Sequence, residues 1–435
     1  GAGPLLLDAV LRAVLLVYAG RTMTDTVILR AGLAVLAADD IQSSVAIEVK
    51  GSRVVGWEHV PESSLTEGER RTILTPGLVN AHTHLDLGAL RGEVPADEGF
   101  TSWVSDLVAK RAELSPEAVA EGVRASAREA LLTGTVSLLD IDSTGATEAA
   151  LAVEGTPMPY CVLLREVLDG SPVGRSARTE AAVGLARASI DRGHGLSPHG
   201  THTVGDELMA ELGRLRAESL RQGRTVPIAV HWAETTEEID WLLRGEGPFT
   251  SWLGPSPGVT GTERMARAGL LEGSLLVHGN HPEPGEAARL GAAGCTVVHC
   301  PGSHLFFRRE RFPLEQYRAH GVNVALGTDS WASNQSLDMR REMRLARETL
   351  GVGAEEAWRM ATEYGAAFVT DENVTGRIAP GVRAHFTAFE HSLAGENHDL
   401  EALRGSCLDV LTRGDPKIRG VWIAGVSVGP LNFPL

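Results

Sequence analysis

Residues 74–87 of the chain read LTPGLVNAHTHLDL, an apolar run that ends in His82 and His84. In a β-strand, residues i and i+2 point to the same side, so both imidazoles are expected to face one point. Two neutral imidazoles that converge are typical of a metal site, because the neutral ring nitrogen is a common metal ligand. The pair therefore predicts a metal at the end of a strand.

Seven more short apolar runs follow, separated by segments with helical signals. Ser115-Pro116-Glu117, for example, is a typical helix start, with an N-cap serine and a proline in the first turn. Eight strands alternating with helices predict an α/β fold of the (β/α)8 TIM-barrel type, with a doubly wound sheet as the competing architecture. The count of eight, and the polar residues at most strand ends, favour the barrel. The predicted strands are residues 78–82, 136–142, 160–167, 195–199, 227–231, 274–278, 296–299 and 323–326, and the predicted helices include 118–132, 235–243 and 337–350.

The two ends of the chain have β character instead. Residues 45–50 alternate large apolar side chains with small or polar ones, which is the pattern of a half-buried strand. β character returns at residues 376–389 and 418–428. We therefore expect a small β-sandwich built from residues 1–74 and 379–435, beside a barrel of residues 75–378. The apolar segment 4–19 is too short to span a bilayer, and we interpret it as one or two strands.

The composition fits an ordinary globular protein, with 43% hydrophobic and 22% charged residues. The net charge of −16 argues against a nucleic-acid-binding surface. The four cysteines have no CxxC spacing, which predicts free thiols in a reducing compartment. We therefore expect a cytoplasmic protein with no nucleic-acid or membrane partner, and association into a homo-oligomer stays open.

Chemically active residues stand at the ends of most predicted strands. In a barrel of this type, functional residues lie at the carboxyl ends of the strands. Three histidines and one aspartate from these positions make a plausible ligand set for one divalent metal, with room for a water. The residues at these ends are His82, His84, His199, His231, Glu234, His278, His299 and Asp329.

These motifs, in this order, resemble the amidohydrolase superfamily, in the branch of cytosine deaminase-like and adenosine-type aminohydrolases. The matching motifs span nearly the whole chain. They are PGLVNAHTH at 76–84, HWAE at 231–234, the sixth-strand histidine, HCPGSH at 299–304 and GTDSWASN at 327–334. The resemblance implies a barrel with a split β-sandwich around it.

The resemblance also implies roles for individual residues. His82, His84, His231 and Asp329 would be the metal ligands. Glu234 would be the proton shuttle.

His278 would contact the metal-bound hydroxide or the developing tetrahedral centre. Dinuclear members of the superfamily bridge two metals with a carboxylated lysine on the fourth strand. This chain has no lysine between Lys110 and Lys417, so a single ion is expected, and zinc, iron(II) or manganese suits the ligands.

The resemblance also implies a mechanism, in which a metal ion and two carboxyl groups control the movement of protons. A divalent metal lowers the pKa of bound water toward neutrality, and Asp329 can accept the proton released. Glu234 stands three residues after a ligand and can protonate a ring nitrogen of the substrate. That protonation makes the adjacent C–NH2 carbon electrophilic, and the proton finally leaves with ammonia. Glu234, His278 and Asp329 are thus the predicted catalytic residues.

Four further residues are candidate substrate contacts: Trp103, Arg165, His199 and His304. Trp103 is suited to stacking on a planar base, although aromatic residues near strand ends more often serve packing. His304 stands where many relatives have asparagine in HCPxSN, and this departure puts the local pocket in doubt. The role of His299 stays open between a buried structural histidine and a functional one.

Arg308 and Arg309 permit two interpretations. The pair is suited to binding a carboxylate, and a surface role is equally consistent with the sequence.

We expect deamination of an aminated purine nucleoside, a small molecule. The HCPxSH variant followed by GTDSWASN resembles the bacterial proteins that deaminate 6-aminodeoxyfutalosine, an adenine nucleoside joined to a benzoate, in menaquinone biosynthesis. The alternative is another reaction on the same scaffold: guanine-, pterin- or adenosine-type deamination, or triazine-type chlorohydrolysis. A non-catalytic binding protein on this fold is a third hypothesis, which the intact ligand and acid–base positions disfavour.

Overall fold

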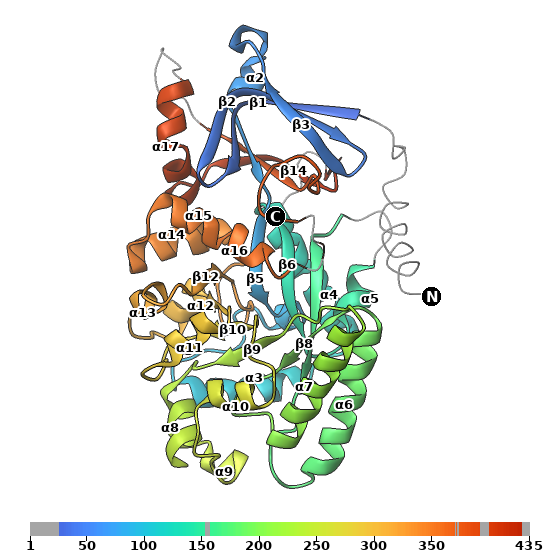
Figure 1. Ribbon diagram of the computed structural model, residues 1–435, viewed down its shortest axis with the longest axis vertical. Helices are drawn as coiled ribbons and strands as arrows, with labels where there is room; N and C mark the ends of the chain where they lie inside the picture. Colours follow the sequence, from blue (N-terminus) through green and yellow to red (C-terminus); the bar gives the residue numbers. More distant parts are fainter. Residues whose placement is uncertain (1–25, 153–156, 370, 372–373, 392–399, 429–435) are drawn as a thin grey trace.

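The computed structural model describes residues 26–152, 157–369, 371, 374–391 and 400–428 (Figure 1). The predicted strands at residues 4–19 lie outside this range. Figure 1 shows a sheet built from both ends of the chain, blue and red, at one end of the molecule, and strands with surrounding helices in the remainder. No helix within the described ranges is long and apolar enough to cross a membrane.

Eight parallel strands form the central part of the molecule. They make two four-stranded sheets in the orders β5-β6-β7-β8 and β9-β10-β11-β12. Parallel bridges join Leu196 to Ile228 and Gly200 to His231, and these connect β8 with β9. The strands are β5 (Leu78–Thr83), β6 (Thr135–Asp142), β7 (Tyr160–Val167), β8 (Gly195–Pro198), β9 (Ala229–Trp232), β10 (Leu275–His278), β11 (Thr296–His299) and β12 (Asn323–Leu326).

The remaining edges, β12 and β5, are also joined. The backbone N–H groups of Thr328 and Asp329 both donate to the carbonyl oxygen of His82, at 3.1 Å each. This close approach requires glycine at position 327, because a Cβ there would lie 2.9 Å from the His82 carbonyl oxygen. The strands therefore close into a barrel, and the predicted fold class is confirmed.

Helices lie between the barrel strands, and their starts follow the expected capping chemistry. Ser115 accepts a hydrogen bond from Ala118 N, and Thr235 accepts one from Glu238 N. The three predicted helices named above are confirmed within two residues. The barrel helices are α3 (Phe100–Ala112), α4 (Pro116–Leu132), α5 (Thr147–Leu151), α6 (Arg175–Asp191), α7 (Asp206–Arg221), α8 (Thr236–Arg244), α9 (Thr250–Leu253), α10 (Gly261–Arg267), α11 (Glu286–Ala292), α12 (Pro301–Phe306), α13 (Leu314–Arg318), α14 (Met339–Leu350), α15 (Ala354–Met360) and α16 (Glu363–Ala366), with a 3-10 segment η2 (Leu85–Leu90) after β5.

Strands from both chain ends form one seven-stranded sheet, the terminal sheet, in the order β15-β14-β13-β4-β1-β2-β3. β4 pairs with β1 on one side and with β13 on the other, so the two chain ends meet there. The pairing of both ends was predicted, and the structure adds that a single hydrogen-bonded sheet results. Its strands are β1 (Thr26–Ala37), β2 (Asp40–Lys50), β3 (Arg53–His59), β4 (Thr72–Pro76), β13 (Phe386–Glu390), β14 (Lys417–Ile423) and β15 (Val426–Ser427), with η1 (Glu62–Ser64) and α2 (Glu67–Arg70) between β3 and β4.

The terminal sheet lies at the amino ends of β5 and β6. Gly77 N donates to His385 O, and Thr387 Oγ1 donates to Gly134 O. The expected boundary at residues 74/75 falls inside β4, so we propose to place it after Pro76; the boundary at 378/379 stays a proposal. The sheet thus supports the end of the barrel opposite the carboxyl ends of the strands.

Helix α17 (Leu400–Arg413) has no counterpart in the sequence prediction. The Arg347 guanidinium in α14 contacts Asp409 Oδ1 at 2.6 Å and Thr412 Oγ1 at 2.6 Å, which attaches α17 to the barrel helices.

Candidate active site

Four of the predicted metal ligands converge at the carboxyl ends of the barrel strands. His84 Nε2 lies 3.2 Å from His231 Nε2. Asp329 Oδ1 lies 3.7 Å from His82 Nε2 and 3.8 Å from His84 Nε2. Each of the four residues is less than a tenth exposed. The sequence prediction that these residues share one point is therefore matched by the geometry.

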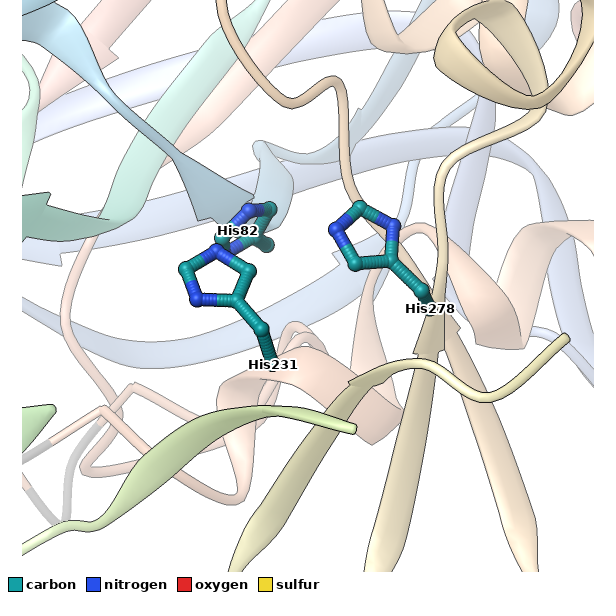
Figure 2. A group of neighbouring side chains, drawn as sticks. All are labelled: His82, His231 and His278. Carbon is teal, nitrogen blue, oxygen red and sulfur yellow. The ribbon is translucent and has the colours of Figure 1, made fainter. Parts of the chain in front are cut away.

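His278 joins the same cluster from β10. Figure 2 shows the rings of His82, His231 and His278 turned toward one another from three strands. One ring nitrogen from each of these three histidines lies within 4.8 Å of the others. His278 therefore faces the same space as the four predicted ligands.

The backbone turns sharply where two of these residues stand. His278 has φ 75° and Asp329 has φ 59°, both in the left-handed region that side chains with a Cβ rarely adopt. Strained backbone of this kind persists where surrounding structure holds it, and it is common at functional sites. Here it directs the side chains at the end of β10 and after β12 into the cluster.

The protonation of the histidines suits ligands. His231 Nδ1 bonds to the carbonyl oxygen of His199, which places the proton on Nδ1 and leaves the Nε2 lone pair free. Burial lowers the pKa of His84, His231 and His278 well below the ordinary value, so these rings are neutral. Within the described part of the chain, neither ring nitrogen of the buried His82 has a hydrogen-bond partner.

Asp329 is held in one orientation by hydroxyl groups. Ser303 Oγ and Ser333 Oγ donate to Oδ2 at 2.9 and 2.8 Å, and Ser330 N donates to Oδ1 at 2.9 Å. Burial alone raises the pKa of Asp329, but the nearby His82 outweighs burial and holds this pKa well below its usual range. Asp329 is therefore a carboxylate with Oδ1 toward the histidines.

This donor set fits a divalent metal. Two nitrogens bound tetrahedrally at about 2.0–2.1 Å from zinc are about 3.4 Å apart, close to the 3.2 Å between His84 and His231. The unpartnered nitrogens of His82, buried in the protein, are explained if one of them binds a cation. His82, His84, His231 and Asp329 could hold one ion together, with His278 beside it.

Glu234 lies next to this cluster, just after β9. Its Oε2 atom is 3.7 Å from His278 Nε2, and its Oε1 atom accepts a hydrogen bond from Arg309 at 2.9 Å. Burial raises the pKa of Glu234 to about 8, against the opposing charge of Arg309. A buried carboxyl with such a pKa can both donate and accept a proton near neutral pH.

Two of the four predicted substrate contacts lie at strand ends: His199 directly follows β8, and Arg165 lies near the end of β7. His199 lies near His231, with ring centroids 5.0 Å apart, and its Nδ1 is 2.7 Å from Thr203 Oγ1. Arg165 at the end of β7 donates to Asp142 O at 3.2 Å.

Trp103 and His304 contact other groups of the protein. Trp103 is 7% exposed and packs edge-on against Phe307, with ring centroids 5.0 Å apart. His304 Nδ1 is 3.2 Å from Asn280 Oδ1.

Glu166 follows Arg165 at the end of the third predicted strand, a position that is expected to face the ligand, and it lies near His199. Glu166, at the end of β7, has Oε1 4.0 Å from His199 Nε2. Burial and, to a smaller extent, the nearby Asp86 raise the pKa of Glu166 to about 8, and the charge of Arg111 opposes them. The sequence signal for Glu166 is its place at a strand end, directly after Arg165.

His299 lies apart from the cluster. It is fully buried, its ring stacks on Phe312 at 4.0 Å, and its carbonyl oxygen accepts from Gly327 N. These contacts favour the structural interpretation of this histidine.

Arg308 and Arg309 do not act as a pair. Arg308 is exposed and contacts Asp97 at 3.5 Å, whereas Arg309 is buried against Glu234. The carboxylate that Arg309 binds is therefore one of the protein's own.

Comparison with known proteins gives a consistent result. Residues 73–428 match the model of the amidohydrolase family. A 5-methylthioadenosine/S-adenosylhomocysteine deaminase of Halobacterium salinarum is 31% identical over 387 residues, which cover 83% of either chain. An aminodeoxyfutalosine deaminase of Deinococcus radiodurans is 29% identical over 342 residues, covering 71% of this chain and 77% of the relative.

A solved structure shares the fold. The adenosine deaminase of Xanthomonas campestris with bound zinc superimposes with a TM-score of 0.74 at 23% identity, covering 94% of each chain. The predicted superfamily is thus confirmed by the family match and the relatives. The chain belongs to the amidohydrolase family.

Proposed function

We propose that this protein is a metal-dependent aminohydrolase that removes the 6-amino group of a purine nucleoside. One observation carries the proposal: Glu234, a buried carboxyl with a pKa raised to about 8, lies beside the histidine–aspartate cluster. Deamination of an aromatic ring needs an acid at this place, because protonation of the ring nitrogen makes the adjacent C–NH2 carbon electrophilic. As a member of the amidohydrolase family, the chain is a hydrolase that acts on C–N bonds.

We propose one divalent ion, zinc, iron(II) or manganese, held by His82, His84, His231 and Asp329. When bound, such an ion lowers the pKa of a water molecule and supplies hydroxide near neutral pH.

The protein's own groups move the protons. Glu234 Oε2 donates a proton to the ring nitrogen next to the C–NH2 carbon, which makes that carbon electrophilic. Asp329 accepts the proton that the attacking water loses, and His278 donates a hydrogen bond to the oxygen that arrives. The C–N bond then breaks and the amino group leaves as ammonia with the proton from Asp329. The remaining proton on the new oxygen returns to Glu234, and an oxo group remains on the ring.

The relatives support a nucleoside substrate. The proteins from H. salinarum and D. radiodurans are named for different substrates that share an adenine nucleoside. We propose 6-aminodeoxyfutalosine as the substrate, and 5-methylthioadenosine or S-adenosylhomocysteine as the alternatives. The benzoate of 6-aminodeoxyfutalosine requires a cation, and Arg165 and Arg111 are the candidates nearest to Glu166 and His199.

An assay for released ammonia, and for released chloride with the chlorotriazine, tests the proposal. The purified protein, loaded with zinc or iron(II), is incubated with 6-aminodeoxyfutalosine, 5-methylthioadenosine, S-adenosylhomocysteine, adenosine, guanine and a chlorotriazine. Release of ammonia from an adenine nucleoside supports the function, and the ratio of kcat/KM values selects the substrate. Turnover of guanine or the triazine alone, or of none of the compounds by metal-loaded protein, would overturn it.

A further inference from the structure

We propose that Arg309 is the positioning residue of the proton shuttle: it fixes the Glu234 carboxyl so that only Oε2 faces the reaction space. This inference rests on the proposed function, because it assigns Glu234 the proton transfer. It gives a role to a residue outside the strand-end motifs, and it specifies which of the two Glu234 carboxyl oxygens transfers the proton.

Arg309 holds Glu234 at two points. Its Nη2 donates to Glu234 Oε1 at 2.9 Å, and its Nη1 donates to the Glu234 carbonyl oxygen at 2.8 Å. Two parallel donors from one rigid guanidinium fix both the position and the rotation of the residue that they bind. The remaining carboxyl oxygen, Oε2, lies 3.7 Å from His278 Nε2.

Arg309 is itself held in place by aromatic rings. The guanidinium carbon lies 5.1 Å from the centroid of Phe100 and 5.0 Å from that of Phe307. The side chains of Arg309 and Glu234 are only 10% and 12% exposed. A cation between two rings in a water-poor site is attracted to both faces and has little freedom to leave.

The loop after α12 directs Arg309 inward. Arg308 N donates to Leu305 O and Arg309 N donates to His304 O, the hydrogen-bond pattern that ends a helix with a left-handed residue. That residue is Arg308, with φ 52°. The chain reverses there, so Arg308 points to solvent and its neighbour points toward Glu234.

Helix α12 also supports a second attachment of the Glu234 backbone, through His304 and Asn280. His304 lies 3.2 Å from Asn280 Oδ1, and Asn280 Nδ2 donates to the Glu234 carbonyl oxygen at 3.0 Å. The Glu234 backbone is thus bound from two sides, while its Oε1 atom depends on Arg309 alone among the side chains described. Removal of the guanidinium should therefore release the carboxyl without releasing the backbone.

The test compares Arg309→Met with Arg311→Met, which changes an exposed arginine two residues away on the same loop. For Arg309→Met we expect kcat to fall about 10²-fold, the cost of misplacing a catalytic group by about 1 Å, with little change in KM. Arg309→Lys keeps the charge without the paired donors and should recover part of the loss. Arg311→Met should match the wild-type protein.

A double variant separates positioning from a merely structural role. If Arg309 acts through Glu234, Arg309→Met should not lower the residual turnover of Glu234→Gln any further, because residues that act as one unit are not additive. An equal loss in both backgrounds, or an Arg309→Met variant within twofold of wild-type kcat, would refute the positioning role. Thermal midpoints and metal content are measured on every variant, and Arg309→Lys replaces Arg309→Met in the cycle if the latter does not fold.

The two proposals fail in different ways. If wild-type protein releases no ammonia from any adenine nucleoside, the proposed function fails. If Glu234→Gln abolishes ammonia release but the Arg309 variants do not reduce it, only the inference about Arg309 fails.

Discussion

The Nε2 atoms of His84 and His231 face each other at 3.2 Å, with ring planes 10° from parallel. One ring follows β5 and the other lies in β9, on separate sheets of the barrel. Burial keeps both rings neutral, and His231 already has its proton on Nδ1. Two buried imidazoles arranged in this way gain most when a cation lies between their lone pairs, so the geometry suits a bound metal ion.

Metal content should depend on His82 and much less on His278. His82→Asn removes a buried ring whose nitrogens have no other partner among the described residues, so bound metal should fall from about one ion per chain to nearly none. His278→Asn should retain the ion and lose turnover. Elemental analysis after dialysis measures both variants. A metal-free His278→Asn protein would instead make His278 a ligand.

Glu234→Gln should separate metal binding from catalysis. The amide keeps the size of the side chain and an acceptor for Arg309, but it cannot carry the proton. We expect normal metal content and a kcat about 10²–10⁴-fold lower, the usual worth of a general acid–base. Near-normal turnover of an adenine nucleoside by this variant would remove Glu234 from the mechanism.

The pH dependence of kcat should report the same carboxyl. Glu234 must be protonated to donate its proton, and its pKa is raised to about 8 by burial. Turnover should therefore be high below this pKa and fall as pH rises through it. A bound cation lowers the pKa of a nearby carboxyl, so the falling limb is expected at or below about pH 8. If the residual activity of Glu234→Gln lacks this falling limb, the limb is assigned to Glu234. If the limb is unchanged in the variant, it belongs to another group.

The sequence predicts most of the barrel because its strands are short apolar runs that end in histidine or aspartate. His82, His231 and Asp329 could be grouped for this reason, since strand ends meet at one rim. Arg309 could not be placed, because its direction depends on the left-handed turn at Arg308 rather than on any periodicity. The place of Glu166 at the end of a predicted strand indicates that it faces the ligand, but its proximity to His199 follows only from the pairing of β7 with β8.

The hydroxyl groups behind Asp329 should tune metal affinity. Ser303→Ala removes one of the two hydroxyl donors to Oδ2 and leaves that of Ser333 in place. Partners behind a ligand typically contribute about 10- to 100-fold in metal affinity or activity, so we expect a loss in this range. Competition with a chelator of known affinity measures it. Ser219→Ala is a matched control, because Ser219 is buried in α7 and its hydroxyl donates to Leu215 O rather than to Asp329. An equal loss in both variants would contradict the role of the Ser303 hydroxyl.

Acid stability should depend on His385, which lies directly before β13 of the terminal sheet and remote from the metal ligands. Burial, followed by the charge of Arg383, lowers the pKa of His385 to about 4 from 6.5 in the unfolded chain. The folded state therefore prefers the neutral ring. The stabilisation is fully present above pH 6.5 and is lost as pH falls toward 4, because the unfolded chain takes up the proton first. By pH 5 the loss is about 2 kcal/mol. His385→Gln offers a neutral acceptor to Ala424 N in place of Nδ1. Urea unfolding at pH 7 and pH 5 should show a smaller pH-dependent loss for the variant than for the wild-type protein, and equal losses would show that His385 does not contribute.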